Sequence, residues 1–198
     1  MKQILIILVF MLSYSSTSIS FAESIQLPNQ YYIEHQSTAF SQDIVLHETS
    51  SSGYYQYING RYAFSVFIPK NLSLAYLPSN DDGCRFSSID GTVTLTASGG
   101  HIAYNSSNAL DDYFALRIKA IGISNTEFID HGDNWFVISW KKDGKIYYQK
   151  TFISNRYKCD NTIEISYPID KKINYNEIVE IIERNFIPGW KTGYKIWG

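Results

Sequence analysis

The sequence has few of the residues from which metal, redox or nucleic-acid sites are built. Only two of its 198 residues are cysteine, and neither lies near a second cysteine or a histidine at metal-ligand spacing. None of the four histidines is three or four residues from another, and no run of lysine or arginine occurs at a formal net charge of −2. We therefore predict no metal and no cofactor, and the charge pattern argues against nucleic acid as a partner.

Residues 1–22 have the pattern of a signal peptide. Lys2 precedes an unbroken apolar run, ILIILVFML, and Ser20-Phe21-Ala22 has the small-x-small pattern that signal peptidase recognises. The apolar run is shorter than the roughly 20 residues that span a bilayer, and no cysteine near it offers a lipid anchor. The sequence thus predicts cleavage after about Ala22 and a periplasmic or secreted protein without a stable membrane anchor. An N-terminal anchor that is retained is the alternative.

Cys84 and Cys159 are the only cysteines of the chain. In an exported protein an even pair predicts a disulfide, and a crosslink closing a loop of this length contributes about 4 kcal/mol in the chain-entropy model. A reactive thiol and half of a metal site are the alternatives. We predict the disulfide, because neither cysteine has a neighbouring ligand or activating histidine in the sequence.

The mature chain divides into an arm, one domain and a tail. Residues 23–53 are polar and serine-rich, and predict an extended N-terminal arm with a short strand at Ile44–Leu46. Residues 54–190 carry regular hydrophobic patterns without a repeat, which predicts a single domain. Residues 191–198 follow the Pro188-Gly189 pair that closes the domain.

Turn-forming dipeptides separate three pairs of predicted strands. Asn-Gly and Asp-Gly supply the positive φ angles of tight hairpin turns, so the strands that they join must be antiparallel. The predicted hairpins are Tyr54–Ile58 with Arg61–Ile68 around Asn59-Gly60, Gly83–Ser88 with Thr92–Ala97 around Asp90-Gly91, and Asn134–Lys141 with Ile146–Ile153 around Asp143-Gly144; further strands are predicted at Thr126–Ile129 and Asn161–Tyr167.

Two helices are predicted among these strands. The first begins after cap candidates at residues 105–108, has an apolar face, and ends at Gly122. The second runs from about Tyr175 to Phe186, and Asn174 with Glu177 resembles a capping box. An antiparallel sheet with helices packed on it belongs to the α+β class.

Four segments of the domain form a recognisable set. They are Arg61–Val66 (RYAFSV) before Pro69, Phe86-Ser87-Ser88 before Asp90-Gly91, Trp135–Trp140 (WFVISW) leading through Asp143-Gly144 to Tyr147-Tyr148, and the closing helix with Ile178, Ile181 and Phe186. Together they resemble the PsbP-like domains and their bacterial periplasmic relatives. The resemblance implies an antiparallel sheet sandwiched between helices, an α/β/α arrangement. It also implies a binding scaffold, since the family includes photosystem assembly subunits, chaperones for secreted effectors and envelope proteins.

Short motifs of serine β-lactamases and penicillin-binding proteins also occur. Ser139–Lys142 has the form SxxK, and Lys191–Gly193 reads KTG. In those enzymes the serine starts a helix, so that the lysine one turn later reaches it. Ser139 lies in a predicted strand, where residues three apart point to opposite faces. We therefore single out no catalytic residue.

Aromatic residues make up 16% of the chain and predict a β-rich protein or, alternatively, an aromatic ligand platform. Trp190, Tyr194 and Trp197 follow the natural end of the domain and are the candidate partner-binding residues; folding back over a sheet edge is their alternative role. We predict a non-catalytic protein-binding module of the bacterial envelope, with an immunity-type or chaperone-like protein as one version. The alternative is a periplasmic hydrolase or a carbohydrate-binding module that uses an aromatic surface.

Overall fold

The computed structural model describes residues 45–49, 51, 53–102 and 108–193. The predicted signal peptide, most of the predicted arm, and Tyr194 and Trp197 of the tail lie outside the described residues. In the described part of the chain, no helix combines the length and the apolar composition needed to cross a membrane. The elements are β1 (Val45–Glu48), β2 (Tyr54–Ile58), β3 (Ser65–Pro69), β4 (Ser73–Tyr76), β5 (Gly83–Ser87), β6 (Thr94–His101), α1 (Ala109–Ile121), η2 (Ile123–Asn125), β7 (Thr126–His131), β8 (Trp135–Lys142), β9 (Lys145–Ser154), β10 (Cys159–Pro168), η3 (Ile169–Lys171), α2 (Lys172–Arg184) and α3 (Gly189–Thr192).

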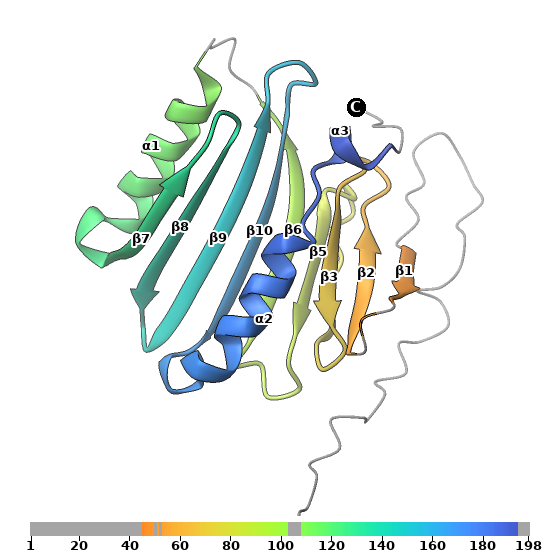
Figure 1. Ribbon diagram of the computed structural model, residues 1–198, viewed down its shortest axis with the longest axis vertical. Coiled ribbons are helices and arrows are strands. Elements are labelled where there is room, and N and C mark those ends of the chain that lie inside the picture. The colour runs from red at the N-terminus through yellow and green to blue at the C-terminus, as the bar shows by residue number, and fades with distance from the viewer. Residues whose placement is uncertain (1–44, 50, 52, 103–107, 194–198) are drawn as a thin grey trace, which may run out of the picture.

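These elements form two antiparallel sheets with helices on both faces of the larger one (Figure 1). The larger sheet has seven strands in the order β4-β5-β6-β10-β9-β8-β7, and the smaller has the order β1-β2-β3. Helix α1 packs on one face over β8, while α2 and the small sheet pack on the other face. The α+β class and the α/β/α arrangement are therefore confirmed, with the small sheet sharing a layer with α2.

Alternation along the strands decides which side chains reach each layer. On β9, Ile146 and Phe152 belong to the main core under α2 and the small sheet, whereas Tyr147 packs with the α1 side. The main core is rich in aromatic contacts: the ring of Tyr57 meets the rings of Phe64 and Phe86 edge-on, each at a centroid distance of 5.8 Å. Strand-favouring aromatic residues thus build the core, as their abundance predicted.

The three predicted hairpins are present, but their turns differ in kind. Asp143 and Gly144 both have positive φ, 50° and 73°, as a tight two-residue turn requires. The Asn59-Gly60 turn is wrong, because β3 begins only at Ser65. Asn59 is buried instead, and its side-chain oxygen accepts a hydrogen bond from the Tyr62 N–H at 2.7 Å. Its amide nitrogen donates to the Tyr57 hydroxyl, so the side chain organises a longer loop.

Both predicted helices are present, with one boundary corrected. Helix α1 ends at Gly122, whose φ of 83° suits glycine. Helix α2 begins at Lys172, directly after η3, so Asn174 lies inside the helix and the predicted capping box is wrong. The helix continues a turn that η3 has already started, and therefore begins without a side-chain cap.

The disulfide predicted between Cys84 and Cys159 is not formed, and both cysteines are free and buried. Cys84 lies on β5 opposite Ala97, and Cys159 lies on β10 opposite His101, with strand β6 between them. Two strand spacings of about 4.8 Å separate their backbones by about 10 Å or more, beyond the roughly 7 Å at which a disulfide closes. Burial raises the pKa of each thiol to about 11, so the folded thiols are poor nucleophiles.

We expect thiol titration of the mature protein to find two free thiols per chain. In guanidinium without reductant both should react at once, and under native conditions both should react slowly, because they are buried and protonated. Cys84→Ser and Cys159→Ser should each leave one reactive thiol in guanidinium. A denatured, unreduced chain with no free thiol would contradict the sheet register.

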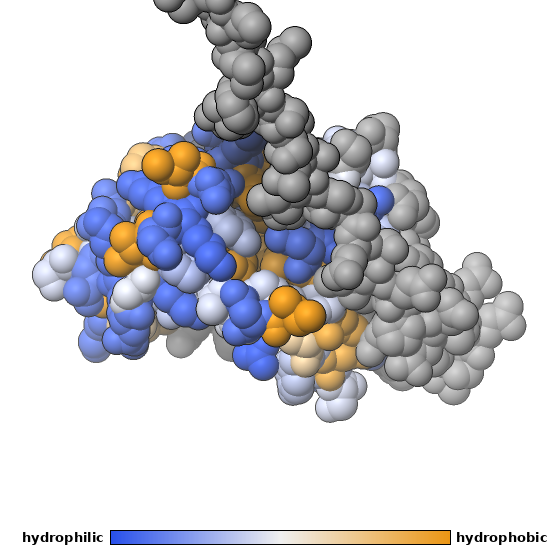
Figure 2. Space-filling view, turned by 90° about the horizontal axis from the view of Figure 1, so that it is seen from below, coloured by the Kyte–Doolittle hydropathy of each residue, from blue (hydrophilic) through white to orange (hydrophobic). Residues whose placement is uncertain are grey.

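The end of the molecule that carries the β5–β6 turn and η3 exposes several isoleucines. Ile89, Ile169 and Ile173 are exposed there, and Lys171 pairs with Asp90 at 3.5 Å. Viewed from this end, hydrophilic surface separates the apolar patches of the described residues that are visible (Figure 2).

Candidate functional site

A groove lies between α2 and the part of the large sheet that α2 leaves open. Strand alternation directs Ser139 and Lys141 of β8 and Tyr148 of β9 to the same face of the sheet as α2. The cavity has a volume of about 270 Å³. We call it the α2 groove, and it is lined by Glu127, Phe128, Ser139, Lys141, Ile146, Tyr148, Tyr167, Lys172, Asn176, Val179, Glu180 and Glu183.

Helix α2 forms one wall because its apolar and polar residues separate onto two faces. Tyr175, Val179 and Ile182 are buried and recur at spacings of four and three. Asn176 and Glu180 each follow one of these residues, and line the groove beside the buried stripe. The same helix thus seals the core and presents amide and carboxylate groups to the groove.

Strand β7 forms the opposite wall, and an irregularity in its pairing shapes it. The register shifts between Thr126 and Phe128. A bulge places two residues opposite one partner, so consecutive Glu127 and Phe128 both line the groove. Glu127 pairs with Lys141 at 2.9 Å, while the side chain of Phe128 is 53% exposed. The groove therefore has an exposed aromatic ring next to an ion pair that is already formed.

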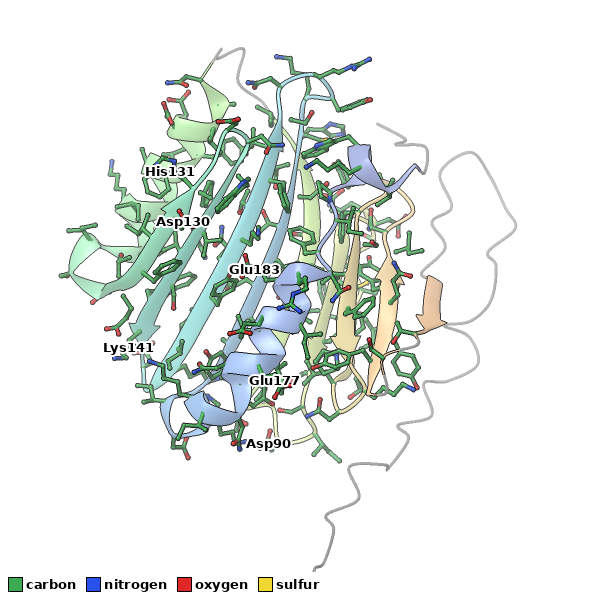
Figure 3. All side chains as sticks on the ribbon, viewed as in Figure 1. Asp90, Asp130, His131, Lys141, Glu177 and Glu183 are labelled. Carbon is green, nitrogen blue, oxygen red and sulfur yellow. The ribbon has the colours of Figure 1, made fainter. Side chains whose placement is uncertain are left out.

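Glu183 of the groove pairs with a lysine that lies between aromatic rings. Lys150 Nζ lies 2.7 Å from Glu183 Oε1 and only 13% of the Lys150 side chain is exposed. The same Nζ lies 4.8 Å from the ring centroid of Trp135 and 5.3 Å from that of Phe152. Glu183 lies on the side of α2 that faces the sheet (Figure 3). The ion pair links α2 to β9, and the cation–π contacts hold the Lys150 ammonium group against the rings of β8 and β9.

The electrostatics of this cluster favour binding over proton transfer. Burial raises the pKa of Glu183, but hydrogen bonds from Lys150 and Tyr148 and the Lys150 charge outweigh burial and hold that pKa below its ordinary value. Burial and the Glu183 carboxylate raise the pKa of Tyr148 well above its usual value. At neutral pH Glu183 is therefore an anion and Tyr148 a neutral donor, and neither pKa lies near the working range of a general acid or base.

The predicted tail residues are only partly within the described chain. Trp190 belongs to α3, and its ring lies 6.5 Å from the rings of Phe152 and Tyr157. Trp190 is half-buried against the main core and so contributes to packing. Tyr194 and Trp197 lie outside the described residues. A partner contact made by this tail stays a prediction.

The sequence reasoning missed the residues that define the groove. Phe128 lies in a predicted strand, and its position on the groove face follows from the bulge at Glu127, which has no local signature. Lys150 did carry a signal, because it is a charged residue among Ile146, Tyr148 and Phe152 on one strand face. A lysine at an inward position predicts a buried acidic partner, and the fold supplies Glu183.

The motif shared with penicillin-binding enzymes has no catalytic geometry. Ser139 lies in β8, opposite Tyr148 of β9, and Lys142 is three residues on, opposite Lys145. The two side chains of the SxxK match therefore point to opposite faces. In the described part of the chain, no group of three or more histidine, cysteine, aspartate or glutamate side chains is arranged to hold a metal ion.

The fold defined by these sheets and helices is similar to that of solved structures. Cyanobacterial PsbP from Synechocystis sp. PCC 6803 has a TM-score of 0.53 and 10% sequence identity, covering 72% of this chain and 96% of that chain. The Saccharomyces cerevisiae Ran-binding protein Mog1p has a TM-score of 0.43 and 9% identity, covering 75% of this chain and 96% of that chain. The first likeness confirms the predicted PsbP-like fold. The second is too distant to support an argument.

The family resemblance therefore rests on three-dimensional structure. No protein-family model matches the sequence, and no curated protein matches it significantly. At 10% identity the likeness concerns the fold alone.

Proposed function

We propose that this chain is a non-catalytic binding module that holds a protein partner in the α2 groove. The observation that carries the proposal is the exposed ring of Phe128 beside charges that are already paired, Lys141 with Glu127 and Lys150 with Glu183. A partner can bury the ring without leaving a charge unpaired. Burying an unpaired charge is what costs most free energy when an interface forms. Aromatic side chains supply much of the binding energy of protein interfaces.

The proposal also covers the localisation and the biological role of the protein. The signal-peptide pattern of residues 1–22 supports export to the periplasm or the medium. A partner would then be an envelope or secreted protein, and immunity-type or chaperone-like binding is the version that we favour. Trp190, Tyr194 and Trp197 are proposed as a second contact region, since tryptophan and tyrosine are enriched among interface residues.

The test is a capture experiment with a matched pair of variants. Tagged mature protein should retain one dominant protein from an envelope extract. Phe128→Ser should lower the retained amount at least about tenfold, because truncating a central aromatic costs about 2 kcal/mol of binding energy. Ile89→Ser removes an apolar side chain that is 99% exposed outside the groove, and should bind as the wild type does.

Each result bears on a separate part of the proposal. Equal capture by wild type and Phe128→Ser would exclude the α2 groove as the binding site. Capture of nothing, repeated at low salt, would count against a binding module altogether. A chain that ends at Gly193 tests the tail in the same assay, and unchanged capture by it would exclude Tyr194 and Trp197 from the contact.

A further inference from the structure

A second cavity lies on the opposite face of the large sheet. Helix α1 packs over β8 on that face and leaves the part formed by β6 and β10 open. A polar cavity of about 290 Å³ opens there beside α1. We call it the sheet dish, and it is lined by Thr96, Ser98, Arg117, Gln149, Thr162 and Glu164. Gln149 and Tyr148 are consecutive on β9, so the dish and the α2 groove are on opposite faces.

Arg117 of α1 is held in place within the dish. Its Nε donates a hydrogen bond to Gln149 Oε1 at 2.5 Å, and its Nη2 donates to Glu164 Oε2. The guanidinium carbon lies 5.0 Å from the ring centroid of Trp140, which supports the flat group from one side. A planar guanidinium fixed by three contacts is already oriented for a ligand, which lowers the entropic cost of binding.

The floor of the dish is an oriented chain of hydrogen bonds. Gln149 Nε2 donates to Thr151 Oγ1 at 2.9 Å, Thr151 and Thr162 share a bond at 3.0 Å, and Thr162 Oγ1 donates to Asp160 Oδ2 at 3.2 Å. A guanidinium only donates and a carboxylate only accepts. In each of these hydrogen bonds the donor therefore lies on the Arg117 side and the acceptor on the Asp160 side. Gln149 and Thr151 are buried, so this floor is rigid.

Several polar atoms at the rim are left for a ligand. Arg117 Nη1, Glu164 Oε1 and the hydroxyls of Thr96 and Ser98 make no hydrogen bond with another side chain or backbone group in the described part of the chain. They combine the two N–H donors of one guanidinium nitrogen, a carboxylate acceptor and two hydroxyls that can donate or accept. The charges of Arg117 and Glu164 cancel, so an anion would meet the carboxylate and a cation would meet the guanidinium.

We propose that the sheet dish binds one unit of a neutral saccharide. Two adjacent sugar hydroxyls can each accept from Arg117 Nη1 and donate to Glu164 Oε1, and further hydroxyls can pair with Thr96 and Ser98. The volume is at the lower end of the roughly 300–1,000 Å³ range of ligand pockets, which suits a single sugar ring. This site is separate from the α2 groove and does not depend on the proposed protein partner.

The test follows backbone amide signals of the ¹⁵N-labelled mature protein during titration. Glucose, galactose, mannose and N-acetylglucosamine are the neutral probes, and sodium sulfate is the charged probe. At least one sugar should shift the amides of Thr96, Ser98, Thr162 and Glu164 saturably, with a Kd on the order of 1 mM, as expected for a shallow site. Sulfate should leave these amides unshifted.

Variants make the assignment specific. Arg117→Lys keeps the charge but loses the fork, and should weaken sugar binding at least about tenfold. Thr96→Val removes one hydroxyl but keeps the shape of the side chain, and should weaken sugar binding several-fold. Ser124→Ala removes an exposed hydroxyl outside the dish and should bind as the wild type does. The proposal is overturned if no sugar shifts these amides, if sulfate shifts them as strongly, or if Arg117→Lys and Thr96→Val bind like the wild type.

Discussion

Replacing Gly189 by alanine is expected to lower the free energy of unfolding by about 3 kcal/mol or more. A Cβ atom at this position would lie 1.8 Å from the Tyr62 carbonyl oxygen and 2.9 Å from the Tyr62 carbonyl carbon. Both are backbone atoms, which cannot rotate away as a side chain would. Urea denaturation of the mature protein, followed by tryptophan fluorescence, measures the loss.

The close approach at Gly189 has a structural cause. Its N–H donates to Asn161 Oδ1 at 2.9 Å, and Asn161 is fully buried. Thr192 Oγ1 donates to the Ala63 carbonyl oxygen at 2.9 Å, and Ile187 forms a β-bridge with Ser65. The chain after α2 is thus held against the loop before β3 on both sides of residue 189. Alanine would force these contacts apart.

Gly193→Ala is the matched control for this prediction. Gly193 has a φ of 82°, and a Cβ there would have no heavy atom of the described chain within 4 Å, its own chain neighbours aside. Its replacement should therefore cost only about 1 kcal/mol, from backbone strain. Similar losses in the two variants would contradict the steric explanation, and so would a Gly189→Ala protein as stable as the wild type.

Lys150→Met is expected to destabilise the protein by about 2 kcal/mol at neutral pH. Methionine keeps the apolar contacts with Trp135 and Phe152 but leaves the Glu183 carboxylate without its cation. Lys141→Met is the control, because Lys141 and Glu127 are 43% and 46% exposed and an exposed pair contributes less than about 1 kcal/mol. Equal losses of unfolding free energy in the two variants would show that the enclosure of Lys150 does not strengthen its ion pair.

The pH dependence distinguishes the lost ion pair from simple loss of packing. The folded pKa of Glu183 is lowered, so its contribution is complete above the unfolded value of about 4.3 and is lost as pH falls through the folded pKa. In Lys150→Met, burial would raise that pKa instead, and acid would relieve the unpaired charge. The stability difference between wild type and Lys150→Met should therefore shrink between about pH 7 and about pH 3. A difference that stays constant would indicate packing alone.

The errors of sequence interpretation arose where distant contacts override a local pattern. Asn59-Gly60 has the composition of a tight turn, but the Asn59 side chain bonds to Tyr57 and to the Asp81 carbonyl oxygen, and these bonds organise a longer loop. The cysteine count predicted a disulfide, but strand order places β6 between Cys84 and Cys159. The Asp143-Gly144 turn was correct because its two positive φ angles depend on those residues alone.

The candidate sites were less accessible to sequence reasoning than the fold. The α2 groove needs a helix after β10 to lie beside a bulged strand that precedes β8, and the bulge at Glu127 is what brings Phe128 to the groove face. In the sheet dish, the pairing of β10 with β9 places Glu164 opposite Gln149, and Arg117 of α1 bonds to both, so residues far apart in the chain become neighbours. Neither arrangement has a spacing that could be recognised in the sequence.

The sequence by itself determined the strands other than β4, the Gly122 helix end and the Asp143-Gly144 turn, because alternation, helical periodicity and glycine φ preferences act within a few residues. Its segment patterns also identified the PsbP-like fold, which the likeness to cyanobacterial PsbP confirms. Only the tertiary structure decided the strand order, the separation of Cys84 from Cys159, and the faces on which the α2 groove and the sheet dish lie. Those features depend on pairing between β6, β10 and β9, whose energies come from contacts between residues distant in sequence.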